Sequence, residues 1–170
     1  MLQLVGAVLL LAGAGAVGYC YVAKLNARVQ GLEHMRAALQ FMERELAFSL
    51  TPMGTIFNAL SQWEEPPVGA FFARCHRGLT HLNEENLDSV WRTATAEELP
   101  MLKSEDAAVL AALGAVLGRY DGEGQQKSLA LTLERLGHCM ENAKSERDRL
   151  GKVYGVLTLS VGAFLVILLL

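Results

Sequence analysis

KLNARVQGLEHMRAALQFMERELAFS (Lys24–Ser49) places a leucine at every seventh residue, and this spacing decides the fold class. Further apolar residues fill the adjacent face, so one side of a helix is apolar throughout. No helix breaker separates this segment from the apolar run before it. We therefore predict one long helix that ends near Ser49, after which Thr51 and Pro52 supply the N-cap and the first-turn proline of the next helix. The apolar positions are Leu25, Val29, Leu32, Met35, Leu39, Met42, Leu46 and Leu50.

A second segment of the same kind lies near the other end of the chain. Its leucines again recur in steps of seven, and the pattern leads directly into the apolar C-terminal run. The two long helices, each with about 27 soluble residues and a length near 40 Å, are expected to run antiparallel as a stalk. The positions are Leu129, Leu133, Leu136, Met140, Ala143 and Leu150.

Four shorter helices are expected between the two long ones, and Pro or loop residues separate them. No segment shows the alternation of a half-buried strand. The fold class is therefore all-α, a bundle of about six helices in one soluble domain, residues 24–151. The expected shorter helices are Thr51–Trp63, Val68–His81, Glu85–Glu98 and Ser104–Arg119.

All 15 basic and 18 acidic side chains lie between Lys24 and Lys152, which leaves both ends of the chain uncharged. The apolar residues of the C-terminal run favour membrane insertion by roughly 4 to 7 kcal/mol. We therefore expect transmembrane helices at residues 1–23 and 152–170, continuous with the first and last helices of the bundle. A cleaved signal peptide is the alternative for residues 1–23, but no basic residue precedes the apolar run there.

Basic residues next to both apolar ends indicate the orientation. They lie only on the bundle side of each predicted span, so the bundle is expected in the cytoplasm and both termini on the other side. Such residues also contact anionic lipid headgroups. The six residues are Lys24, Arg28, Lys144, Arg147, Arg149 and Lys152.

Residues that could carry chemistry are few. The sequence lacks a phosphate loop, a dinucleotide-binding glycine pattern, a nucleophile elbow and an HExxH pair. Cys75-His76 and His138-Cys139 offer four ligand atoms but lack zinc-site spacing, so packing is the better interpretation. The formal net charge of −3 gives no nucleic-acid footprint. We predict neither an enzyme nor a metal or cofactor site.

The segment from Leu113 to Gln125 is the most informative interior feature. Gly114 and Gly118 lie one helical turn apart and would let a neighbouring helix approach closely. Asp121 is expected to cap the last long helix. A structural turn is the preferred interpretation, and a docking surface for another protein is the alternative. In the predicted second span, helix packing within the membrane is expected at Gly151, Gly155 and Gly162.

At these residues the sequence resembles the stage III sporulation protein AB family. The matching positions are Leu113-Gly114, Leu117-Gly118, Asp121 and Gln125, and further matches extend over all 170 residues. They include Glu43-Arg44-Glu45 before Thr51-Pro52, then Pro67-Val68, Trp91 and Gly155-Val156-Leu157.

The resemblance implies a membrane component of the channel that joins mother cell and forespore during endospore formation. It also implies a bundle similar to the cytoplasmic domain of the type II secretion platform protein, F family. The implied partners are other stage III sporulation membrane proteins, a secretion-type ATPase and the lipid bilayer, with a homo-oligomer possible. The implied location is the mother-cell membrane facing the forespore. A membrane-anchored helical signalling or adaptor protein is the alternative function.

Overall fold

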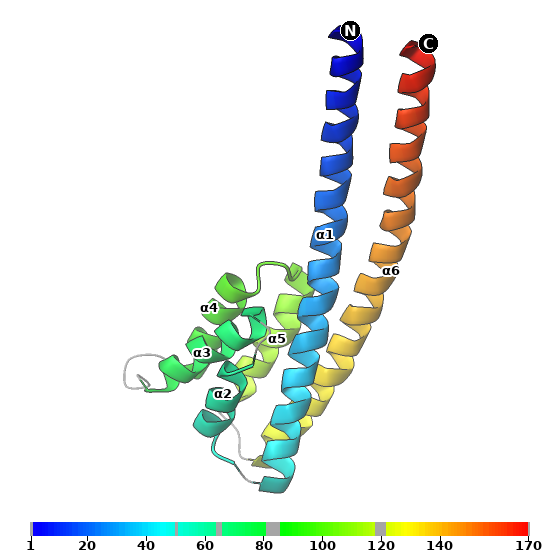
Figure 1. Cartoon of the computed structure of the whole chain (residues 1–170). Helices are drawn as coiled ribbons and strands as arrows, with labels where there is room; N and C mark the ends of the chain where they lie inside the picture. The colour runs from blue at the N-terminus through cyan, green and yellow to red at the C-terminus, as the bar shows by residue number, and fades with distance from the viewer. Residues whose placement is uncertain (1, 50, 64–65, 81–85, 118–121, 170) are drawn as a thin grey trace. The chain divides into compact units, whose positions relative to one another are not determined.

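The structure is a computed structural model that describes residues 2–49, 51–63, 66–80, 86–117 and 122–169, with some side chains in the apolar ends and near residue 122 left undescribed. The described residues are almost entirely helical and contain no strand, which confirms the all-α fold with six α-helices (Figure 1). The elements are α1 (Leu2–Arg44), the π-helical segment η1 (Glu45–Ser49), α2 (Met53–Ser61), α3 (Pro66–Thr80), α4 (Leu87–Glu98), α5 (Ser104–Leu117) and α6 (Gly122–Leu169).

The chain divides into two compact units, and α1 and α6 contribute to both. One unit consists of residues 1–27 and 142–170, and the other, the bundle, consists of residues 28–141. The two long helices are uninterrupted, since neither α1 nor α6 contains a proline. The expected end of the first helix near Ser49 is confirmed by η1, which continues α1 to that residue.

The start of α2 differs from the expectation. Pro52, with φ −58° and ψ 140°, is the residue that precedes the helix, and no side chain caps its first turn. The hydroxyl of Thr51 instead donates a hydrogen bond to the Glu45 carboxylate, 2.8 Å away. The prediction of a Thr51 N-cap is therefore wrong, because the π-helical turn brings Glu45 within reach of the hydroxyl.

The proline pair between α2 and α3 also has a different role from the one expected. Pro66 and Pro67 are the first residues of α3 rather than a breaker before it. Proline fits this position because its ring presets a helical φ and its missing N–H would have no partner in the first turn.

An aromatic cluster forms the centre of the bundle. Trp91 of α4 is fully buried and packs edge-on against Phe71 of α3, with ring centroids 4.8 Å apart. Phe57 of α2 and Phe72 of α3 complete the cluster. The apolar face predicted for α1 is buried as well, from Val29 to Met42 within the bundle. Burial of these large side chains supplies the main stabilising term of the bundle.

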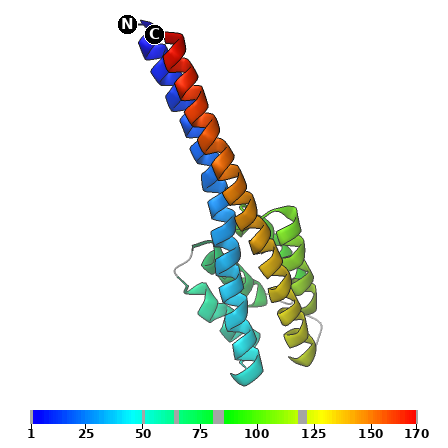
Figure 2. The ribbon, with the colours of Figure 1, turned by 90° about the vertical axis from the view of Figure 1, so that its right-hand side faces the viewer.

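In the other unit, the N-terminal part of α1 and the C-terminal part of α6 run antiparallel and side by side, and both termini lie at the same end (Figures 1 and 2). The rings of Tyr21 and Tyr154 join the two helices, with centroids 4.8 Å apart. Among the residues that the structure describes, no helix combines the length and the apolar character needed to cross a membrane. Large apolar side chains on these helix ends are nevertheless exposed, among them Tyr19, Val156, Leu157 and Phe164.

Candidate functional site

Gly114 of α5 lies directly against Trp91 of α4. A Cβ atom built on Gly114 would stand 2.5 Å from Cδ1 and 2.6 Å from Cγ of the Trp91 indole. The indole Nε1 donates a hydrogen bond of 2.8 Å to the carbonyl oxygen of Leu110, one turn earlier in α5. A side chain at position 114 would therefore displace the tryptophan from its buried hydrogen bond.

Gln125 lies in the first turn of α6 and its side chain contacts the C-terminal end of α5. Its Nε2 donates a hydrogen bond of 3.1 Å to the carbonyl oxygen of Leu117, the last residue of α5. Such carbonyls have no partner within their own helix, so the glutamine caps α5. The neighbouring Gln126 donates in the same way to the carbonyl oxygen of Leu46, at 3.2 Å. Gly118 and Asp121, the other two predicted residues of this turn, lie outside the described residues.

A buried ion pair between α1 and α5 is the main feature that sequence reasoning missed. Arg28 is only 3% exposed and binds both carboxylate oxygens of Asp106, with Nε to Oδ2 at 2.8 Å and a terminal nitrogen to Oδ1 at 2.9 Å. The same terminal nitrogen reaches Glu105 at 2.7 Å. Asp106, which is fully buried, also accepts a hydrogen bond from the backbone N–H of Lys103 at 3.0 Å.

This ion pair corrects the prediction that Arg28 contacts lipid headgroups, because its guanidinium is enclosed by α5. The hydrogen bonds to Asp106 raise the pKa of Arg28 further above its usual value, so the side chain stays charged. One local feature of the sequence indicates a structural role for Asp106. Asp106 stands third in α5, where a carboxylate can accept from the N-cap N–H, but nothing in the sequence pairs it with a residue 78 positions away.

The two cysteine-histidine pairs of the bundle occupy different environments. Cys75 is fully buried in α3, and its desolvation raises the pKa of the thiol to about 12. His76 Nδ1 lies 3.1 Å from the carbonyl oxygen of Gly54, which ties α3 to α2. Burial and the nearby Asp106 carboxylate raise the pKa of Cys139. Within the described ranges, no group of three or more metal-ligating side chains lies together.

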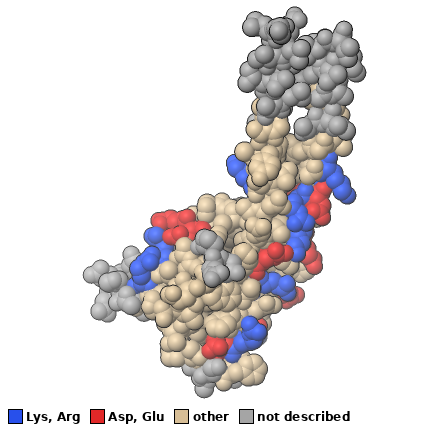
Figure 3. Space-filling view, viewed as in Figure 1, with Lys and Arg blue, Asp and Glu red and all other residues tan. Residues whose placement is uncertain are grey.

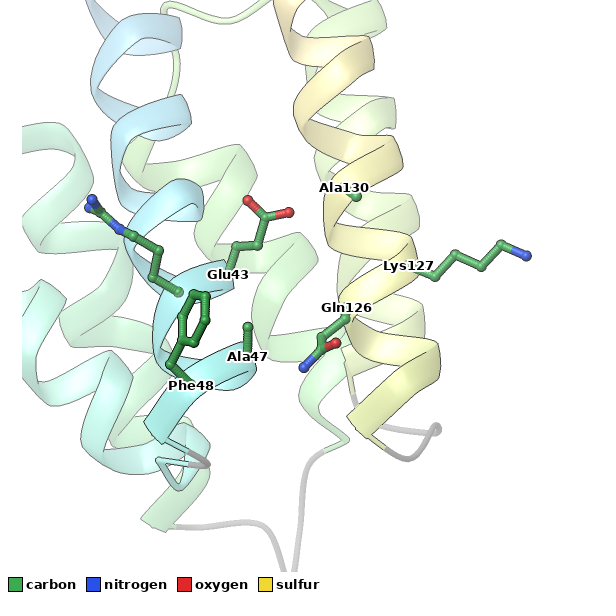
Figure 4. A pocket seen from close by; sticks show the side chains of 7 residues that line it. Glu43, Ala47, Phe48, Gln126, Lys127 and Ala130 are labelled. Atoms are coloured by element: carbon green, nitrogen blue, oxygen red, sulfur yellow. The ribbon is translucent and has the colours of Figure 1, made fainter.

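A hollow of about 410 Å³ lies between the end of α1 with η1 and the start of α6. Figure 4 shows Glu43, Ala47 and Gln126 at the space between the two helices, whereas Lys127 points away from it. Phe48 is 86% exposed at its edge. Such an exposed phenyl ring suits contact with a protein surface, because aromatic side chains are enriched in protein interfaces.

Charged side chains on the visible face of the bundle alternate in sign (Figure 3). Arg74 pairs with Glu97 and Glu98, and Arg92 pairs with Asp88 at 2.9 Å. This mixture differs from the continuous basic stripe of a nucleic-acid interface.

The glycines predicted to pack in the second span lie on α6. A Cβ atom added at Gly151 or Gly155 would meet no described atom within 4 Å, so neither position is closely covered by α1. The surroundings of Gly162 lie outside the described part of the chain. Packing of these residues against a partner subunit stays a prediction.

Comparisons with known proteins agree with one another. The family model of stage III sporulation protein AB matches residues 3–170 of this chain. A relative from Bacillus subtilis (strain 168), named stage III sporulation protein AB, is 27% identical, and the match covers 99% of each chain. A solved structure of a stage III sporulation protein AB superposes with a TM-score of 0.64 at 25% identity, covering 72% of this chain and 98% of that chain.

Proposed function

This chain belongs to the stage III sporulation protein AB family, and from that premise we propose that it is a membrane-anchored, non-enzymatic platform subunit. It serves the secretion-like complex that forms the channel between mother cell and forespore during endospore formation. Its bundle is a protein-binding module, and its two apolar helix ends hold that module at the mother-cell membrane facing the forespore.

The exposed apolar surface of the paired helix ends is the observation that carries this proposal. Tyr19, Val156 and Phe164 are largely exposed, and residues 1–23 and 153–170 contain no charged side chain. Large apolar side chains exposed on helix ends without charge are unfavourable in water and favour insertion into lipid. The two ends therefore act as transmembrane helices in this proposal, and the bundle lies in the cytoplasm next to the basic boundary residues.

The partners in this proposal are the other stage III sporulation membrane proteins and a secretion-type ATPase. The exposed Phe48 ring beside the hollow supports a protein-binding role, since an aromatic side chain can anchor an interface by entering a pocket of the partner. The sequence lacks the phosphate-loop, dinucleotide-binding, nucleophile-elbow and HExxH motifs, which favours assembly over catalysis.

Affinity purification of the full-length chain from sporulating cells tests the proposal. After cross-linking, we expect the tagged chain in the membrane fraction, together with membrane proteins of the sporulation complex and the ATPase. A Phe48→Ala variant should recover fewer partners, whereas Leu131→Ala, a change at another exposed apolar residue of the bundle, should not. Recovery in the membrane fraction with signalling proteins only would favour the membrane-anchored adaptor alternative, and recovery in the soluble fraction would contradict the membrane anchor.

A further inference from the structure

A slot on the paired helix ends combines a cation, two aromatic rings and a small-residue floor. Its lining consists of Ala16, Cys20, Tyr21 and Lys24 of α1 and Tyr154 of α6, around a volume of about 330 Å³. All five residues belong to the same compact unit.

The spacing of the α1 residues gives the slot a direction. Ala16, Cys20 and Lys24 are four residues apart, so they lie above one another on one helix face over about 12 Å. The two small side chains leave room at the apolar end. Lys24, the first charged residue of the chain, stands at the other end.

The tyrosine pair forms the wall of the slot. The rings of Tyr21 and Tyr154 contact each other at 4.8 Å with planes inclined by 44°. Tyrosines are enriched at the level of lipid headgroups, where one side of the ring is apolar and the hydroxyl is hydrated. Among the described residues no carboxylate pairs with Lys24, whereas Arg28, one turn later, is occupied by Asp106.

We propose that this slot is a binding site for one anionic phospholipid. The acyl region lies along Ala16 and Cys20 against the tyrosine wall, and the phosphate accepts hydrogen bonds from the Lys24 ammonium. This inference rests on the proposed membrane location but assigns a specific site, with Lys24 rather than the other boundary residues as the phosphate ligand.

Native mass spectrometry of the full-length chain in a neutral detergent tests the site, because such a micelle has no surface charge to attract lipid. We expect one phosphatidylglycerol per chain to be retained and phosphatidylcholine to be lost. Lys24→Gln should weaken retention about fivefold, the contribution of one basic residue next to an anionic lipid headgroup. Lys24→Arg should preserve it, and Tyr154→Ala should lower it.

Lys152→Gln is the matched control, because it removes the last basic residue of the chain but does not line the slot. Equal losses in Lys24→Gln and Lys152→Gln would overturn the site in favour of general electrostatic attraction, and so would unchanged retention in Lys24→Gln. Complete displacement of lipid by inorganic phosphate would assign the site to free phosphate. Absence of the unmodified chain from cell membranes would instead contradict the proposed function, so the two failures are distinguishable.

Discussion

At the scale of single residues, Gly114 is the position where one added methyl group has the clearest consequence. Gly114→Ala places a Cβ within 2.5 Å of the buried Trp91 ring, and we expect a loss of about 1–3 kcal/mol in the free energy of unfolding from overpacking. Denaturant unfolding followed by helical circular dichroism would measure it.

Gly137→Ala is the matched control for this change. Gly137 also lies inside a helix, but a Cβ there would meet nothing within 4 Å. The substitution should leave stability unchanged or raise it by up to about 1 kcal/mol through helix propensity. Equal effects at the two positions would refute the close α4–α5 approach as the reason for glycine.

The Arg28–Asp106 pair gives a second prediction at this scale. Arg28→Met leaves the fully buried Asp106 carboxylate without its cation, which should cost about 3–5 kcal/mol. The double variant Arg28→Met, Asp106→Leu removes both charges and should regain most of that loss. Denaturant unfolding of the unmodified chain, the single variant and the double variant would measure the differences in stability.

An exposed ion pair provides the reference for that experiment. Arg92 and Asp88 are four residues apart on α4, with the Arg92 side chain largely in solvent. Arg92→Met should change stability by no more than about 0.5 kcal/mol. A double variant no more stable than Arg28→Met would contradict the uncompensated Asp106 charge as the cause of the loss.

At the scale of elements, the packing of α3 can be followed through its cysteine. Because burial raises the pKa of Cys75 to about 12 from 9.0, the folded bundle holds the thiol proton where the unfolded chain releases it. The contribution of the protonated thiol to the free energy of unfolding is complete below about pH 9. It declines as the pH rises towards 12, so the bundle unfolds more easily over that range. Unfolding midpoints measured between pH 8 and 11 would show the decline.

Two further measurements separate the effect of the Cys75 thiol from general alkaline unfolding. Cys75→Ala should flatten the pH dependence, although it lowers stability at every pH through the lost packing. At pH 8 iodoacetamide should modify Cys75 only after denaturant is added. Rapid modification without denaturant would contradict the tight packing of α3.

The helices themselves could largely be predicted from the sequence. The seven-residue spacing from Leu25 to Leu39 fixes which face of α1 is buried, because local periodicity and burial have the same cause. Helix ends were less predictable: Thr51 had the right chemistry for a cap, but the π-helical turn η1 brought the Glu45 carboxylate within reach of its hydroxyl.

The candidate site was predictable only where its causes are local. A close helix approach at Gly114 could be predicted because glycine lowers the stability of a helix. The residue that requires this glycine, Trp91, lies 23 residues away in the sequence and could not be predicted. The Arg28–Asp106 pair and the slot on the paired helix ends depend on which helices pack together. A local sequence pattern does not indicate that packing.

At the scale of the whole molecule, the proposed topology places both termini outside the mother-cell cytoplasm and the bundle inside it. Its basis is the asymmetry of basic residues around two uncharged ends. Single cysteines in a chain whose native cysteines are replaced by alanine can test it. Ala59→Cys on an exposed position of α2 reports on the bundle, and a cysteine appended after Leu170 reports on the C-terminus.

A membrane-impermeant maleimide is then added to intact cells and, separately, to lysed cells. We expect the appended cysteine to react in both samples and the cysteine at position 59 to react only after lysis, because the bilayer shields the bundle. Labelling of position 59 in intact cells, with protection of the C-terminus, would mean the inverted orientation. Protection of both sites in intact cells would place the C-terminus in the cytoplasm together with the bundle, and the second predicted span would then be wrong even if the bundle still bound its partners.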